Sequence, residues 1–306
     1  MLSATTRFGR ALNEEIANYG KESENPTMNR RLIAPRILAH LSIVFLIWGN
    51  GCANLSSIQE FASISAQSAE YTRLVDQYVE SPARQKRFQP AAQNDRLDQM
   101  TRQRAAQKDR LLLRHALIAE YMNALGKLAA DEVVDFDNGI EGLERAVVEN
   151  KFVNEKDADA FTSVSSILLR ATADSWRKKE LQKLITDSNG PFQEVVGALK
   201  RIVGQEFSGD MENEKLAMRN YYETLIHSSS DKAGIAALQE WKDTRLTEAD
   251  VRAQSDSNYA QVLSKIALGH QQLYDKRDDL GSQELIRQLK QYSNDLRQLV
   301  NAIKSP

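Results

Sequence analysis

The chain has 306 residues, with 40 Lys and Arg against 42 Asp and Glu, and a formal net charge of −2 at pH 7. This balance lacks the basic field that gathers nucleic acid, so we expect no nucleic-acid partner. The single cysteine, Cys52, excludes an intramolecular disulfide, and the chain is long enough to bury a core without one.

Residues 28–51 follow the order of a secretion signal. A basic start, Met28-Asn29-Arg30-Arg31, precedes an apolar run from Ile37 to Trp48, and small residues lead to Cys52. The apolar run is well short of the roughly 18–20 residues that a spanning helix needs. We therefore expect a cleaved signal, with a membrane-anchor helix as the alternative.

Residues 1–27 do not fit such a signal. They are polar and of mixed charge, and they contain Glu14, Glu15, Glu22 and Glu24 ahead of the basic start. We expect that they are an upstream extension and that translation begins at Met28.

The segment Gly49-Asn50-Gly51-Cys52 resembles the lipobox of bacterial lipoproteins, in which a small residue precedes a lipid-modified cysteine. The family prefers Leu, Val or Ile where this chain has Gly49. The resemblance implies cleavage after Gly51 and acylation of Cys52, which would anchor residues 52–306 in the bilayer on the periplasmic side of the cell envelope. Ala53, in place of Asp, favours the outer membrane. The alternative is a buried, inert Cys52 thiol.

An all-α fold is predicted after Cys52. Proline occurs only at Pro82, Pro90 and Pro191 before the C-terminal residue, glycine is sparse, and helix formers dominate. No alternating strand pattern is present. We expect one elongated bundle of about seven to nine helices, with residues 82–96 as a hinge or surface loop.

Helical periodicity and breakers locate the predicted helices in chain order. The first begins at the capping box Ser57-x-x-Glu60 and ends at Pro82. Further helices are predicted over 113–128, 161–185, 192–202, 216–226 and 285–303, and another is predicted to start at Thr247-x-x-Asp250. The helix over 192–202 follows the break Asn189-Gly190-Pro191, and the helix over 216–226 follows the break Ser208-Gly209-Asp210. The helix that starts at Thr247 follows the loop 228–231.

The histidines do not form a metal motif. His115, His227 and His270 lack the Glu-x-x-His and His-Glu-x-x-His spacings of metal-binding helices. No nucleophile elbow or phosphate-binding glycine loop occurs either, so we expect no catalytic residue, no cofactor and no enzymatic activity.

Asp135, Asp137 and Asn138 resemble the start of a calcium loop. An EF-hand has Gly at position six and Glu at position twelve, whereas here Gly139 falls at position five and Ala146 at position twelve. We favour a polar turn that caps the next helix, with a calcium site as the alternative.

One basic segment occurs on a predicted helix. Its five basic residues surround the helix rather than forming one stripe, which favours a solvated surface. The alternative is contact with anionic head groups or an acidic partner. The residues are Arg102, Arg104, Lys108, Arg110 and Arg114. Phe207, Tyr221, Tyr222, Trp176 and Trp241 are predicted to lie in the core or at helix crossings.

The mature region resembles the uncharacterised helical lipoproteins of Gram-negative envelopes. That resemblance, together with the absence of catalytic motifs, favours a non-enzymatic interaction or structural module that binds another envelope protein. The first alternative is a bundle that holds a small apolar or aromatic ligand between its helices, and the second is an enzyme of unrecognised type.

Overall fold

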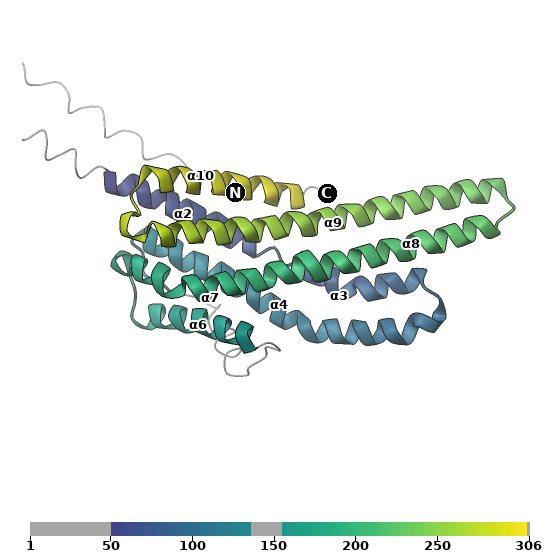
Figure 1. Ribbon diagram of the computed structural model, residues 1–306, viewed down its shortest axis with the longest axis horizontal. Coiled ribbons are helices and arrows are strands. Elements are labelled where there is room, and N and C mark those ends of the chain that lie inside the picture. Colours follow the sequence, from purple (N-terminus) through teal and green to yellow (C-terminus); the bar gives the residue numbers. More distant parts are fainter. Residues whose placement is uncertain (1–49, 136–154, 305–306) are drawn as a thin grey trace, which may run out of the picture. The chain divides into compact units, whose positions relative to one another are not determined.

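A computed structural model describes residues 50–135 and 155–304, all within one compact unit of the chain (Figure 1). Side chains are described from Leu55 and, after the gap, from Ala158. The predicted upstream extension, nearly all of the predicted signal, Asp137 and Asn138 lie outside these residues. Among the described residues, no helix combines the length and the apolarity that crossing a bilayer requires.

The predicted all-α class is confirmed, because the described residues form helices and no strand. In order, the helices are α2 (Asn50–Ala69), α3 (Arg73–Gln85), α4 (Asn94–Ala129), α6 (Glu155–Ala173), α7 (Leu181–Arg201), α8 (Ser208–Ser228), α9 (Lys232–Asp275) and α10 (Gln283–Lys304). Short 3-10 turns, Lys86–Phe88 and Ala91–Gln93, connect α3 to α4, and a π-helical turn, Ile202–Phe207, joins α7 to α8 without a break.

Apolar stripes read from the sequence form the main core. On α10 the predicted face supplies Leu285, Leu289, Leu296 and Ile303, all buried. The stripes of α4 and α6 are buried in the same cluster, with contributions from α2, α7 and the C-terminal part of α9. Helix α2 packs between α4 and α10, and α9 packs along α7, α8 and α10.

Two predicted breaks and one predicted helix start are wrong, because the helices continue through them. Asn189-Gly190-Pro191 lies inside α7, Ser208-Gly209-Asp210 lies inside α8, and Thr247-x-x-Asp250 lies inside α9. Glycine costs about 1 kcal/mol and proline about 3 kcal/mol within a helix. Burying each large apolar side chain contributes roughly 1.5–3 kcal/mol. In α7 the buried residues that follow outweigh the cost, and these are Phe192, Val195, Val196 and Leu199.

The predicted first helix is also wrong at both ends and in its middle. Ser57 is a buried residue within α2 and caps nothing, and the chain leaves the helix between Ala69 and Arg73. Pro82 lies inside α3 instead of ending it. Because proline has no N–H, the Tyr78 carbonyl loses its helical donor, and Arg104 Nη1 donates to that carbonyl instead, at 3.1 Å.

Two helices end in Schellman motifs that contain no glycine. After α6, Ser175 adopts a φ of 49°, and the Trp176 N–H donates to the Ala171 carbonyl at 2.8 Å. After α4, Asp131 with a φ of 63° has the same role. The predicted helix over 161–185 is therefore divided, because α6 ends at Ala173 and α7 begins at Leu181.

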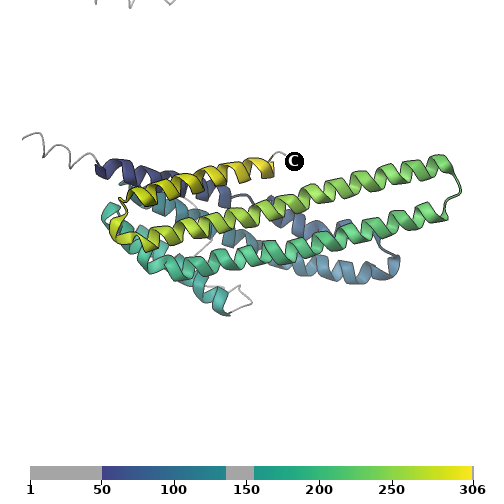
Figure 2. The same ribbon diagram turned by 45° about the horizontal axis from the view of Figure 1, so that its top comes forward.

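Helices α8 and α9 form a long antiparallel hairpin (Figure 2). The predicted loop at 228–231 is confirmed, and the Asp231 carboxylate caps α9 by accepting from the N–H groups of Ala233 and Gly234. With 44 residues, α9 is about 66 Å long. Its N-terminal part packs against α8 through a small second cluster, Met211, Met218 and Ala249, with Phe88, Leu246 and Ala253 around it.

Candidate functional site

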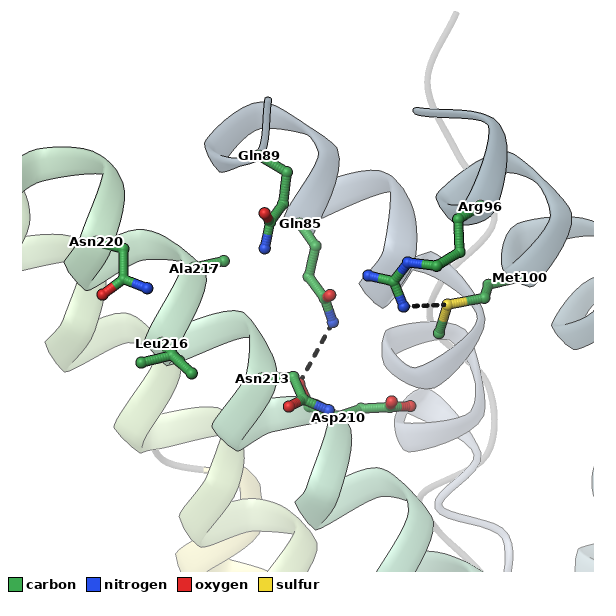
Figure 3. Close-up of a pocket in the computed structure, with 9 residues that line it drawn as sticks. All are labelled: Gln85, Gln89, Arg96, Met100, Asp210, Asn213, Leu216, Ala217 and Asn220. Atoms are coloured by element: carbon green, nitrogen blue, oxygen red, sulfur yellow. Dashed lines mark hydrogen bonds between the residues drawn. The ribbon is translucent and has the colours of Figure 1, made fainter. Parts of the chain in front are cut away.

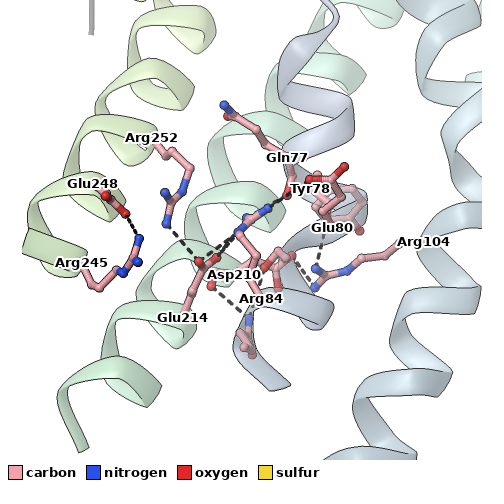
Figure 4. A network of polar contacts seen from close by, with 12 residues as sticks. Gln77, Tyr78, Glu80, Arg84, Arg104, Asp210, Glu214, Arg245, Glu248 and Arg252 are labelled. Atoms are coloured by element: carbon pink, nitrogen blue, oxygen red, sulfur yellow. Dashed lines mark hydrogen bonds and ion pairs between the residues drawn. The ribbon is translucent and has the colours of Figure 1, made fainter. Parts of the chain in front are cut away.

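Ion pairs between helices join α3, α4, α8 and α9 in a region here called the polar layer (Figure 4). Its charged residues are Arg84, Arg104, Asp210, Glu214, Arg252 and Asp256. At its centre the Glu214 side chain is 0% exposed and lies between two arginines. Arg84 Nε and Arg252 Nη2 each donate to Glu214 Oε1 at 3.0 Å, and Arg84 Nη2 donates to Oε2 at 3.0 Å. A carboxylate removed from water in this way needs charged partners and hydrogen bonds to offset the cost of its desolvation.

A second ion pair in this layer joins Arg104 of α4 to Asp210 of α8. The Arg104 guanidinium also lies over the Tyr78 ring, 4.5 Å from the centroid, and donates to the Tyr78 carbonyl. The Tyr78 ring stacks on Phe207 at a centroid distance of 4.3 Å, and its hydroxyl donates to Glu206 at 3.2 Å. Burial, reinforced by the Glu206 charge, raises the pKa of Tyr78 to about 12, so this hydroxyl stays a donor.

Asp256 of α9 completes the layer and is 3% exposed. Burial raises the pKa of its carboxyl to about 7, while the nearby guanidiniums of Arg84 and Arg252 lower it and Asp210 raises it. Among the described residues, no donor reaches Asp256 Oδ1.

An open cleft of about 180 Å³ lies beside this layer, between α3, α4 and α8 (Figure 3). Amide side chains dominate its lining, and Gln85 Nε2 donates to the Asp210 carbonyl at 3.4 Å on its floor. The lining includes Gln85, Gln89, Arg96, Asn213, Leu216 and Asn220. This polar cleft differs from the closed apolar cavity of several hundred Å³ that the alternative ligand-binding function requires.

Two buried histidines lie in the main core. His270 Nδ1 donates to Asn189 Oδ1 at 3.0 Å, and its Nε2 accepts from the Tyr121 hydroxyl at 2.6 Å. His115 Nδ1 donates to the Ala69 carbonyl at 2.9 Å. Burial lowers the pKa of His270 to about 3 and that of His115 to about 4, so both imidazoles are neutral structural groups.

The predicted basic segment does not act as one surface. Arg104 is 6% exposed and paired inside the bundle, which corrects its assignment as a surface contact. Lys108 Nζ lies 2.7 Å from Asp76 Oδ1, and Arg110 and Arg114 also have partners. Arg102 is exposed. Arg104 is therefore not available for contact with anionic head groups.

The remaining predicted site residues are distributed over the chain. Asp135 is exposed and forms an ion pair with Lys127. Within the described residues, no three His, Cys, Asp or Glu side chains gather as metal ligands would. Cys52 falls within the first turn of α2, and its side chain lies outside the described part.

The aromatic predictions divide between the core and the surface. Phe207, Trp176 and Tyr222 are buried as expected. Trp241 is 57% exposed and Tyr221 39% exposed, so neither belongs to the core. Tyr221 contacts the Phe88 ring of the α3–α4 connection, at a centroid distance of 5.7 Å. Trp241 and Tyr221 lie on the α8–α9 hairpin, Trp241 in its outer part.

No local sequence signal identifies the polar layer. Arg84 and Glu214 are far apart in the chain, and each looks like one more charged residue on an amphipathic helix. The one available hint was Pro82, because a proline inside a helix frees a carbonyl that needs another donor.

Comparison of the chain with protein-family models, with curated proteins and with solved structures gives no match.

Proposed function

We propose that this chain is a periplasm-facing lipoprotein, anchored by acylation of Cys52, with the outer membrane favoured as its location. We propose that it serves as a non-enzymatic interaction module of the cell envelope. We propose further that its contact surface is residues 223–248, here called the distal hairpin. The observation that carries this assignment of the contact surface is the lack of buried side chains in the distal hairpin. Between Tyr222 and Ala249, both helices lack a fully buried residue, and Trp241 is 57% exposed.

A two-helix hairpin covers its apolar residues on one side only. Leu225 and Ile226 of α8 and Ile235 and Leu238 of α9 are half-buried, and no third described helix covers them. A helix laid along such a seam would complete their burial, as the third helix does in a bundle. Large exposed aromatic residues such as Trp241 are frequent anchors of protein interfaces.

The net negative charge of the distal hairpin favours a positively charged partner. The distal hairpin contains more carboxylates than cationic groups: Glu223, Asp231, Glu240, Asp243 and Glu248 against Lys232, Lys242 and Arg245. Its expected partner is an amphipathic helix of an envelope protein, with an apolar stripe flanked by Lys or Arg. Complementary charges of this kind increase the association rate and select the partner.

The place of the distal hairpin suits an anchored protein. Both ribbon views place the start of α2, which contains Cys52, and the distal hairpin at opposite ends of the described unit (Figures 1 and 2). Acyl chains on Cys52 would hold one end at the bilayer, with two chains giving durable attachment. The hairpin would then extend toward partners away from that surface.

Site-specific photo-crosslinking in native envelopes tests this proposal. A photoreactive phenylalanine derivative replaces Trp241, and in the control it replaces Lys290, an exposed residue of α10. We expect a discrete adduct only from position 241, with the crosslinked peptide of the partner being an amphipathic helix of net positive charge. A lipid adduct, an adduct to a second copy of this chain, or equal adducts from both positions would contradict it.

The affinity of the crosslinked helix provides the second measurement. With the purified chain, Trp241→Ala should weaken binding of that helix by about 30-fold, the effect of losing an interface anchor of about 2 kcal/mol. Lys290→Ala should leave the dissociation constant unchanged. Equal affinities of the Trp241→Ala variant and the original chain would remove the distal hairpin from the interface.

A further inference from the structure

A cavity of about 10 Å³ lies inside the polar layer, where α3, α8 and α9 meet. Its lining includes Gln77 and Ser81 of α3, Asp210 of α8 and Asp256 of α9. This volume is close to the roughly 10–15 Å³ that one water molecule needs. Phe207 and Met211 add apolar surface to the lining, and the four polar side chains supply the hydrogen-bond partners that an occupied water site requires. The cavity therefore has the size and the chemistry of a single-water site.

Within the described part of the chain, three buried acceptor atoms of this lining lack a hydrogen-bond donor, and one of them, Asp210 Oδ2, still has the Arg104 guanidinium as its ion-pair partner. Asp256 Oδ1 and Gln77 Oε1 have no hydrogen-bond partner among the described residues. An unsatisfied buried polar atom costs about 1–3 kcal/mol. A water has two O–H donors, which equals the number of these two acceptors, and both acceptors line the cavity.

The charges around the cavity leave one carboxylate without a countercharge. The polar layer contains three guanidiniums. Arg84 of α3 and Arg252 of α9 act directly on Asp256, and Arg104 of α4 pairs with Asp210. The carboxylates are Glu206 of the π-helical turn, Asp210 and Glu214 of α8, and Asp256 itself; Tyr71 and Tyr78 also face the layer and are neutral. Glu214 and Asp210 have direct arginine partners, whereas no ion pair forms at Asp256 within the described residues. One proton on Asp256 would balance the set.

We propose that this cavity is a binding site for one water and one proton: the water donates to Asp256 Oδ1 and Gln77 Oε1, and the Asp256 carboxyl carries the proton until a rise in pH removes it. The raised pKa of Asp256, about 7, agrees with this assignment. Ionisation would leave an uncompensated charge between α9, α3 and α8, and would favour states in which α9 separates from α3 and Asp256 reaches water.

Hydrogen exchange measured over a pH range tests the proton. When an opening exposes Asp256, its carboxyl ionises at the ordinary value near 3.9. The opening constant of the amides at 249–258, corrected for intrinsic exchange rates, should therefore rise by up to tenfold per pH unit between about pH 5 and 7, and level off above about 7. Asp256→Asn keeps the uncharged shape and should remove this dependence.

A matched control and a direct titration make the test decisive. Asp243→Asn, at an exposed position of α9, should keep the dependence of the original chain. The ¹³C carboxyl signal that disappears in Asp256→Asn should titrate near pH 7. The proposal is overturned if that signal titrates near pH 4, or if Asp256→Asn retains the pH dependence.

The occupant of the cavity is tested separately. A crystal structure of the full chain should show one water within hydrogen-bond distance of Asp256 Oδ1 and Gln77 Oε1. An empty cavity would overturn the proposal that a water binds there. A metal ion with oxygen ligands at about 2.3 Å would overturn the proposal that a proton supplies the positive charge. The opening constants should be the same in Na⁺ and in tetramethylammonium at equal ionic strength. A difference between the two cations would contradict a proton as the source of the positive charge.

Discussion

Gly269 of α9 lies so close to Phe61 of α2 that a Cβ at position 269 would fall 2.2 Å from Phe61 Cζ. The Phe61 side chain is fully buried in the main core. Glycine at 269 therefore permits the close approach of α9 and α2, despite its low helix propensity.

Gly269→Ala should lower the free energy of unfolding by about 1–3 kcal/mol, because the added methyl group overpacks the core. Gly209→Ala is the matched control, since a Cβ there meets nothing within 4 Å and alanine is the better helix former by about 1 kcal/mol. Urea denaturation followed by circular dichroism measures both. A Gly269→Ala variant as stable as the original chain would show that α2 and α9 are not packed this closely.

Glu214→Gln should lower the free energy of unfolding by about 3–5 kcal/mol, because it removes the buried carboxylate that two partly buried guanidiniums share. Glu248→Gln is the control: its carboxylate pairs with Arg245 at 2.8 Å, and both side chains are about half exposed. Exposed pairs of this kind contribute at most about 1 kcal/mol. Equal urea midpoints for the two variants would mean that the polar layer is hydrated.

The buried histidines predict acid sensitivity with a defined sign. Their pKa values in the folded chain, about 4 for His115 and about 3 for His270, lie below the usual value near 6.5. Between the folded-state pKa values and about pH 6.5, the unfolded chain therefore binds more protons than the folded chain. Stability should therefore fall as pH decreases from 6.5 to about 4, by up to about 1.4 kcal/mol per pH unit for each histidine. Asp256, with its pKa raised, contributes a slope of opposite sign between about pH 4 and 7.

His270→Gln should reduce this acid slope by the contribution of one proton, and His115→Gln should do the same. His227→Gln, at an exposed position, should leave the slope as it is. Urea midpoints collected between pH 4.5 and 6.5 give the slopes directly. If His270→Gln and His227→Gln have the same slope, the His270 imidazole is protonated within the fold.

Cys52→Ala should release the chain from the membrane fraction, because the proposed acyl chains would have no sulfur to join and no new N-terminal cysteine would form. Fractionation of cells followed by detergent phase partitioning measures the change. Intact mass of the native protein gives the complementary result: cleavage before Cys52 together with added acyl groups. An uncleaved leader with an unmodified thiol would refute the anchor.

The fold class and the core faces followed from periodicity, because burial of a stripe such as Leu285, Leu289 and Leu296 is a local property of one helix. The ends of the helices did not. Pro82 and Pro191 are strong local breakers, yet each lies in a helix whose packing against other helices outweighs the local cost. Ser175 and Asp131 end helices in a conformation for which glycine is the usual signal.

The polar layer was not predictable from single residues. Arg104 looked like a member of a solvated basic surface because its partner, Asp210, lies in another helix and far away in the chain. Trp241 looked like a core residue because large aromatic residues are usually buried. Both errors have one cause: a side chain's surroundings depend on which helices meet, and local spacing carries no information about that.

The π-helical turn at Ile202–Phe207 has a consequence for how the two ends of the bundle are joined. Such a turn accommodates one additional residue in an otherwise regular helix. Removing that residue would rotate α8 about the helix axis by about 100° relative to α7. Glu214 would then turn away from both arginines, while Leu199 and its neighbours would keep their places. The angular phase between the two ends thus depends on a single inserted residue.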